Sequence, residues 1–190
     1  MARALLIVDV QNDFAEGGAL GVDGGNAVAA GITELLQQSD HYELVAASRD
    51  WHEAVGDNGG HFARPGEEPD FDTTWPPHCV QGSLGADYHP ALDVSRIDVH
   101  LRKGAGEPAY SAFEGVTREC LTLAEVLREH GIDALDIVGI ATDYCVRASA
   151  LDAIDLGLSA RVLSDLITGV APASSVAALK AMAAAGVELH

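Results

Sequence analysis

Short apolar runs and longer amphipathic stretches alternate along this chain. Runs such as Ala4–Val10 and Leu135–Ala141 are apolar almost without interruption, which is typical of strands buried on both faces of a sheet. In several stretches between such runs, apolar residues recur every three or four positions, as on one face of a helix. The strands predicted in this way cover residues 4–10, 44–48, 98–103, 135–141, 160–165 and 187–189, and the helices cover residues 27–36, 117–130, 143–156 and 173–185.

This order of strands and helices predicts an α/β fold in three layers, α/β/α, around a mainly parallel sheet of about six strands. The 190 residues suit one domain, so we expect a single domain over 1–190. One segment breaks the rhythm: residues 51–93 are rich in Gly, Pro, His and aromatic residues and show no clear period. A loop of that length in a compact domain is usually functional.

Composition and charge narrow the classes of partner. The longest apolar runs fall far short of the ~20 residues that span a bilayer, and Met1-Ala2-Arg3 leads almost directly into a strand, so we expect a cytoplasmic protein without a membrane partner. The formal net charge of −18 repels nucleic acid and anionic lipid. Three cysteines without dense spacing fit a reducing compartment. The pattern is compatible with either a monomer or a homo-oligomer.

Reactive side chains stand at the ends of three predicted strands. Asp9 falls near the end of the first strand, Lys103 ends the third, and Cys145 follows the fourth. In parallel sheets the ligand site lies beyond the carboxyl ends of the strands. Cys145 also begins a predicted helix, where free backbone N–H groups stabilise a thiolate. We therefore expect Cys145 as a nucleophile, Asp9 as general base and acid, and Lys103 as the balancing charge.

A plainer interpretation of each residue stays open at this point. A cysteine in an apolar setting is often inert core, and an Asp and a Lys at strand ends often form only an ion pair. Cys120 lies on the predicted helix over 117–130 and is assigned to packing. Cys79, next to His78, is assigned a structural role.

The long loop carries a second set of chemical groups. Asp50 and His52 share one extended segment, and His61 and His78 follow. One carboxylate with three imidazoles suits zinc, iron or manganese with positions left for water or substrate. Scattered loop histidines are also commonly just solvated. We expect one divalent metal ion held by these four residues.

Taken together, these segments resemble the nicotinamidases, also called pyrazinamidases, of the isochorismatase-like cysteine hydrolases. The likeness runs in order through nearly the whole chain. The Asp-x-His and Trp-Pro-x-His segments separate nicotinamidases from relatives that lack the metal. The matching segments are LIVDVQNDF at 6–14, RDWH at 49–52, WPPHCV at 75–80, KG at 103–104, YSAF at 110–113 and GIATDYCV at 139–146.

The resemblance implies a role for each matching residue. It implies Asp9, Lys103 and Cys145 as a catalytic triad. It also implies that the Ile140–Ala141 peptide bond is cis and that the N–H groups of Ala141 and Cys145 form an oxyanion hole. Tyr144 departs from some relatives, which carry histidine before the nucleophile. The implied metal ligands are Asp50, His52, His61 and His78, and the implied substrate pocket consists of Phe14, Trp75, Tyr110, Ile140 and Tyr144.

The activity that the resemblance implies is hydrolysis of nicotinamide, and also of pyrazinamide, through a thioester on Cys145. The metal or its bound waters would anchor the pyridine nitrogen. Two alternatives remain: a related cysteine amidase for another small amide or carbamoyl compound, and a homologue that binds without turnover.

Overall fold

The computed structural model describes residues 2–39 and 41–190 and shows one six-stranded sheet. The strands lie in the order β3-β2-β1-β4-β5-β6, and all the paired neighbours are parallel. The expected parallel sheet of six strands is confirmed. The strands are β1 (Arg3–Val8), β2 (Leu44–Asp50), β3 (Val99–Lys103), β4 (Ala134–Ile140), β5 (Ser159–Thr168) and β6 (Glu188–Leu189).

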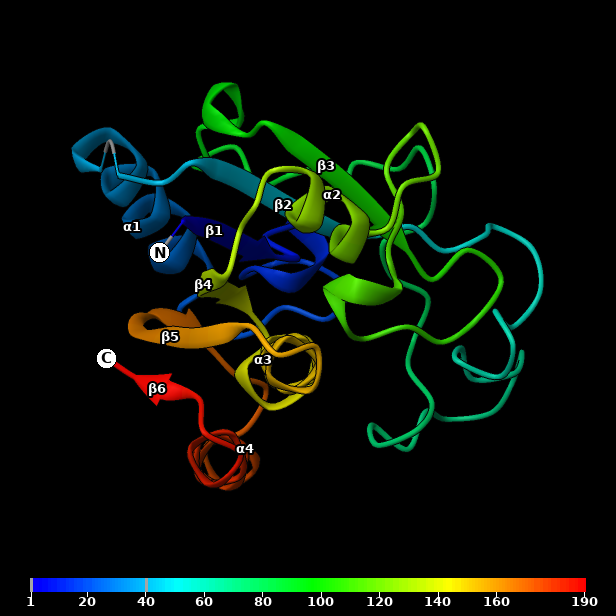
Figure 1. The fold of residues 1–190 in the computed structure, drawn as a ribbon. Coiled ribbons are helices and arrows are strands. Elements are labelled where there is room, and N and C mark those ends of the chain that lie inside the picture. Colours follow the sequence, from blue (N-terminus) through cyan, green and yellow to red (C-terminus); the bar gives the residue numbers. More distant parts are fainter. Residues whose placement is uncertain (1, 40) are drawn as a thin grey trace.

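Helices cover both faces of this sheet, which confirms the three layers (Figure 1). On one face, Ile32 and other apolar residues of α1 pack with Leu5 and Ile7 of β1. On the other face, Leu6 of β1 packs with Leu127 of α2 and with α3 and α4 residues. Because side chains alternate between the two faces along a strand, the strands contribute to two separate hydrophobic cores. The helices are α1 (Gly25–Gln38), α2 (Leu123–Glu129), α3 (Arg147–Asp155) and α4 (Pro172–Ala184).

The helix expected over 117–130 is shorter than predicted. It begins only at Leu123, because Thr122 and Glu125 form a capping box that fixes the start of α2. Cys120 lies before it, with a φ of 63°, and its side chain is exposed. The assignment of Cys120 to helix packing was therefore wrong. Cys79 is buried, and its structural role stays a prediction.

The carboxyl ends of the strands meet the long loop that follows β2. Figure 1 shows this segment, cyan to green, lying beyond the ends of the strands. Gln11 ties the loop to the strands: its side-chain N–H group donates to the carbonyl oxygens of Asp50 at 2.9 Å and Ala86 at 3.0 Å. Among the described residues, no helix has the length and apolar character needed to span a membrane.

Candidate active site

Asp9, Lys103 and Cys145 meet at the carboxyl end of the sheet because β1 and β4 are neighbours and β3 lies two strands from β1. The Lys103 Nζ atom lies 2.9 Å from Asp9 Oδ2 and 3.7 Å from Cys145 Sγ. Ser48 Oγ donates to the other Asp9 oxygen at 2.7 Å. All three side chains of the set are buried. The structure thus places the predicted nucleophile, base and cation in mutual contact.

Asp50 brings a second carboxylate to the same ammonium group. Lys103 forms an ion pair with Asp50 and donates to the Ala109 carbonyl oxygen at 3.2 Å. Burial opposes ionisation of Asp50, but Lys103 and the neighbouring histidines hold the pKa of this carboxyl well below its usual range. Lys103 thus faces two buried carboxyl groups, Asp9 and Asp50.

The surroundings of Cys145 oppose ionisation of its thiol. Burial raises the pKa of the Cys145 thiol well above its ordinary value, and the carboxylates of Asp9 and Asp50 add to it against Lys103. Burial also raises the pKa of Asp9.

A tight turn after β4 presents the cysteine to the cavity. Residues Thr142–Val146 form a π-helical turn that leads into α3. The carbonyl oxygen of Cys145 accepts a 2.7 Å hydrogen bond from Ser149 Oγ, which itself accepts from the Ala112 N–H group. The peptide bond before the turn, Ile140–Ala141, is cis, as expected.

Three histidines of the long loop gather beside Asp50. One ring nitrogen from each of His52, His61 and His78 lies within 4.8 Å of those of the other two, and all three side chains are buried. The Oδ2 atom of Asp50 lies 3.5 Å from His52 Nε2 and 3.6 Å from His78 Nε2. The structure therefore brings together all four residues expected to hold a metal.

The hydrogen bonds of these rings fit a metal site. The Nδ1 atoms of His52 and His78 lie 2.7 Å and 2.8 Å from the carbonyl oxygens of Gly104 and Pro76. Donation from Nδ1 leaves each Nε2 lone pair free for a metal, as in known metal sites. Within the described part of the chain, His52 Nε2 and His61 Nδ1 are buried without a hydrogen-bond partner. Burial lowers the pKa of His61 to about 3, which keeps this ring neutral, the form that binds metal.

Gly104, directly after β3, packs closely against the histidine cluster. Its φ is +81°, and a Cβ atom built on it would lie 2.5 Å from Cε1 of His52. The residue directly before it is Lys103. One short segment therefore sets the positions of both the ammonium group and a histidine of the cluster.

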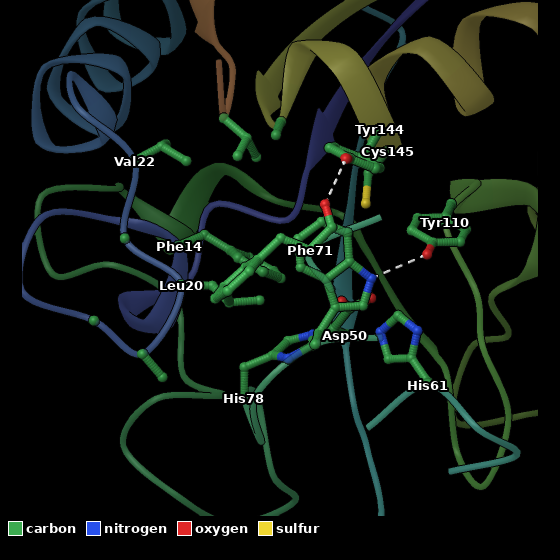
Figure 2. Close-up of a pocket in the computed structure, with 16 residues that line it drawn as sticks. Phe14, Leu20, Val22, Asp50, His61, Phe71, His78, Tyr110, Tyr144 and Cys145 are labelled. Carbon is green, nitrogen blue, oxygen red and sulfur yellow. Dashed lines mark hydrogen bonds and ion pairs between the residues drawn. The ribbon is translucent and has the colours of Figure 1, made fainter. Parts of the chain in front are cut away.

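A cavity of about 350 Å³ opens above Cys145 and is walled by aromatic rings. In Figure 2, Phe14, Leu20 and Val22 lie on one side, Tyr110 on the opposite side, and His61, His78 and Asp50 between them, facing Cys145. Trp75, Ala141 and Tyr144 also line it, whereas Asp9, Lys103 and His52 do not.

Ile140 corrects one expectation about the pocket. Its side chain is fully buried in the core on the α1 side and does not line the cavity. The alternation of β4 explains this, because Val138 and Ile140 point to the same face of the sheet.

Several residues near the site were missed from the sequence, among them Leu20, Val22, Phe71 and Asp143. Phe71 lines the cavity from the middle of the long loop. Asp143 turns its carboxylate away from the cavity and accepts hydrogen bonds from the N–H groups of Val170 at 3.0 Å and Ala171 at 3.2 Å, next to the start of α4. The acid before a helix was a visible signal for Asp143, but nothing in the local pattern marked Phe71.

The comparisons with known proteins agree with this geometry. Residues 3–190 match the isochorismatase domain family. The chain is 51% identical to the nicotinamidase/pyrazinamidase of Mycobacterium tuberculosis over 98% of its own length and 97% of the relative's. It resembles the pyrazinamidase of Pyrococcus horikoshii in complex with zinc (TM-score 0.83, 34% identity, 100% of this chain and 99% of that one). It also resembles PnC1 of L. infantum in complex with nicotinate (TM-score 0.85, 36% identity, 100% and 92%). The chain belongs to the isochorismatase domain family and, within it, to the group of nicotinamidases.

Proposed function

We propose that this protein hydrolyses nicotinamide to nicotinate and ammonia, and accepts pyrazinamide, another amide on a single aromatic ring. The observation that carries the proposal is the contact of Lys103 with both Asp9 and Cys145: Cys145 lines a cavity with aromatic walls, and Asp9 and Lys103 are buried beside it. The similarity to a nicotinamidase/pyrazinamidase and to a structure holding nicotinate supports this substrate class. We also propose a cytoplasmic location, which the three free cysteines support.

The first half of the reaction forms a thioester. Asp9 removes the thiol proton as Cys145 Sγ attacks the carboxamide carbon and the C–S bond forms. The summed charge of Asp9, Lys103, Cys145 and the substrate stays constant in this step. The N–H groups of Ala141 and Cys145 stabilise the oxyanion. The C–N bond then breaks as Asp9 gives its proton to the departing nitrogen, and ammonia leaves.

The second half returns the enzyme to its starting state. Asp9 removes a proton from a water molecule that attacks the thioester carbon, and the same N–H groups stabilise the second oxyanion. The C–S bond breaks, Asp9 returns the proton to sulfur, and the acid leaves. Lys103 remains charged throughout, because Asp50 and Asp9 outweigh the effect of burial and raise its pKa well above the usual value.

Asp50, His52, His61 and His78 are the residues that would hold a divalent metal ion. Such an ion, when bound, supplies positive charge beside Asp50 and a coordination position that anchors the ring nitrogen of the substrate, directly or through water. The similarity to a pyrazinamidase in complex with zinc supports a divalent metal. Zinc, iron and manganese all accept this donor set.

Ammonia release from nicotinamide by metal-loaded protein tests the proposal. Cys145→Ala should lower turnover by at least about 10³-fold, because it removes the nucleophile. Cys120→Ala is the matched control, since Cys120 is exposed and outside the cavity. If the wild type releases no ammonia, a panel of small amides and carbamoyl compounds tests the related cysteine amidase, and failure across the panel leaves a binding protein without turnover.

A further inference from the structure

A segment of the long loop lies across the mouth of the cavity. We call Asp70–Trp75 the cover loop. Phe71 and Trp75 of this loop both line the cavity, and their rings meet at 6.2 Å between centroids and 83°. Phe71 remains 54% exposed. Its ring thus separates the cavity from solvent.

The cover loop has a fixed shape of its own. The Asp70 carboxylate accepts hydrogen bonds from the N–H groups of Asp72 at 3.0 Å and of Thr73 and Thr74 at 2.8 Å each. Phe71 is held at a φ of 57°, and its N–H group donates to the Thr74 carbonyl oxygen at 3.1 Å. These hydrogen bonds hold the Phe71 backbone in place within the loop.

Two tyrosines tie the cover loop to the rest of the site. The Tyr144 hydroxyl donates to the Phe71 carbonyl oxygen at 3.3 Å, and the Trp75 indole N–H donates to the Tyr110 hydroxyl at 3.2 Å (Figure 2). The Tyr144 ring also meets the Trp75 ring edge-on at 5.0 Å and stacks on Tyr110 at 6.0 Å. Tyr144 directly precedes the nucleophile in sequence, so its hydroxyl couples the cover loop to the turn that carries Cys145.

We propose that the Tyr144 hydroxyl, by holding the Phe71 carbonyl, sets the upper size limit of the aromatic ring that the site accepts. The inference rests on the proposed function and deepens it. A pyridine carboxamide has two fixed ends, the amide carbon at Cys145 and the ring nitrogen at the Asp50 and histidine side. In the proposed binding mode, a group added at ring position 5, away from both ends, meets the wall that Phe71 and Trp75 of the cover loop form.

Two variants distinguish the effect of the Tyr144 hydroxyl from that of the Phe71 ring over the cavity. Tyr144→Phe removes the hydroxyl and keeps the ring against Trp75, whereas Phe71→Ala removes the covering ring and keeps the carbonyl oxygen. Tyr88→Phe is the matched control, because the Tyr88 hydroxyl contacts Ala47 and His100 and lies outside the cavity.

The experiment compares nicotinamide with 5-methyl- and 5-ethylnicotinamide in each protein. In Tyr144→Phe, we expect kcat/KM for the 5-ethyl amide, relative to nicotinamide, to rise by about threefold to tenfold, the effect of one neutral hydrogen bond. Phe71→Ala should raise the ratio at least as far, and Tyr88→Phe should keep the wild-type ratio. The Kd ratio of nicotinate and 5-ethylnicotinate, measured by calorimetry, should change in the same direction.

The outcomes separate this inference from the proposed function. A ratio within twofold of wild type in Tyr144→Phe, with the wild type active, overturns the inference whatever Phe71→Ala does, and leaves the activity standing. If the wild type releases no ammonia from any of the amides, the proposed function fails. The Kd values of nicotinate and 5-ethylnicotinate then decide whether the hydrogen bond between Tyr144 and Phe71 limits ring size.

Discussion

The sheet carries two buried clusters of charged residues. One has more carboxyl groups than cations, and the other has more cations than carboxyl groups. At the carboxyl ends of the strands, Asp9 and Asp50 share the ammonium group of Lys103. Toward the other end, the single carboxylate of Asp136 on β4 accepts hydrogen bonds from Arg161, including one at 2.9 Å from Nε, from Arg3, and from the Tyr42 hydroxyl at 2.9 Å.

The difference shows what separates a structural cluster from a reactive one. Burial alone would raise the pKa of Asp136, but the hydrogen bonds from Arg161, Tyr42 and Arg3 outweigh it and lower the pKa. For Asp9, burial prevails over Lys103, and the pKa is raised. A carboxylate with a surplus of donors holds its charge and stabilises the fold, whereas one that competes for a shared cation can exchange a proton.

Replacing Asp9 should give the largest effect on function. Asp9→Asn removes the group that carries the proton, and we expect kcat/KM for nicotinamide to fall by about 10²- to 10⁴-fold. The free energy of unfolding should stay within about 1 kcal/mol of wild type or rise, since one of two competing buried carboxylates is lost. Ammonia release and urea unfolding measure the two quantities. A large fall in the unfolding free energy of Asp9→Asn would contradict the contrast between Asp9 and Asp136.

The matching change in the other cluster should have the opposite outcome. Asp136→Asn leaves two guanidinium groups facing a neutral amide, and we expect it to lower the free energy of unfolding by about 2 kcal/mol. The kcat/KM value should remain within twofold of wild type, because Asp136 does not line the cavity. Urea unfolding and ammonia release are again the measurements. Lost turnover with unchanged stability would show that the two clusters are not separable.

Metal removal tests whether the carboxyl-end cluster depends on an added cation. In protein stripped with a chelator and checked for metal content, we expect the KM for nicotinamide and the Kd for nicotinate to rise roughly tenfold. The Tm should also fall, because His52 Nε2 and His61 Nδ1 remain buried without partners. Restored metal should reverse both effects. Unchanged constants in metal-free protein would remove the four residues from the proposed site.

The smallest expected effect is the pH dependence of the Asp136 cluster. Because the folded-state pKa is lowered, its stabilisation is full above the unfolded value of about 3.9 and is lost as pH falls through the folded-state pKa. The difference in unfolding free energy between wild type and Asp136→Asn should therefore shrink as pH falls below about 5. Urea unfolding of both proteins across this range measures it. A difference that stays constant down to pH 2 would show that the charge of Asp136 contributes nothing.

How far the sequence could predict the structure depended on how local each signal is. Continuous apolar runs marked the strands, and strand-end residues such as Asp9 and Lys103 revealed the shared edge. The turn at Cys120 was missed because a helical spacing of apolar residues hid the capping box at Thr122. Phe71 could not be placed, because its position depends on the Asp70 turn and on the contact with Tyr144, which is distant in sequence.

The contact between Gly104 and His52 also limits how this protein can vary. Any larger side chain at position 104 would push against a ring of the histidine cluster while straining the segment that holds the ammonium group of Lys103. A substitution at this one position would therefore disturb both halves of the site. In a saturation library selected for growth on nicotinamide salvage, position 104 should be among the least tolerant outside the reacting residues themselves.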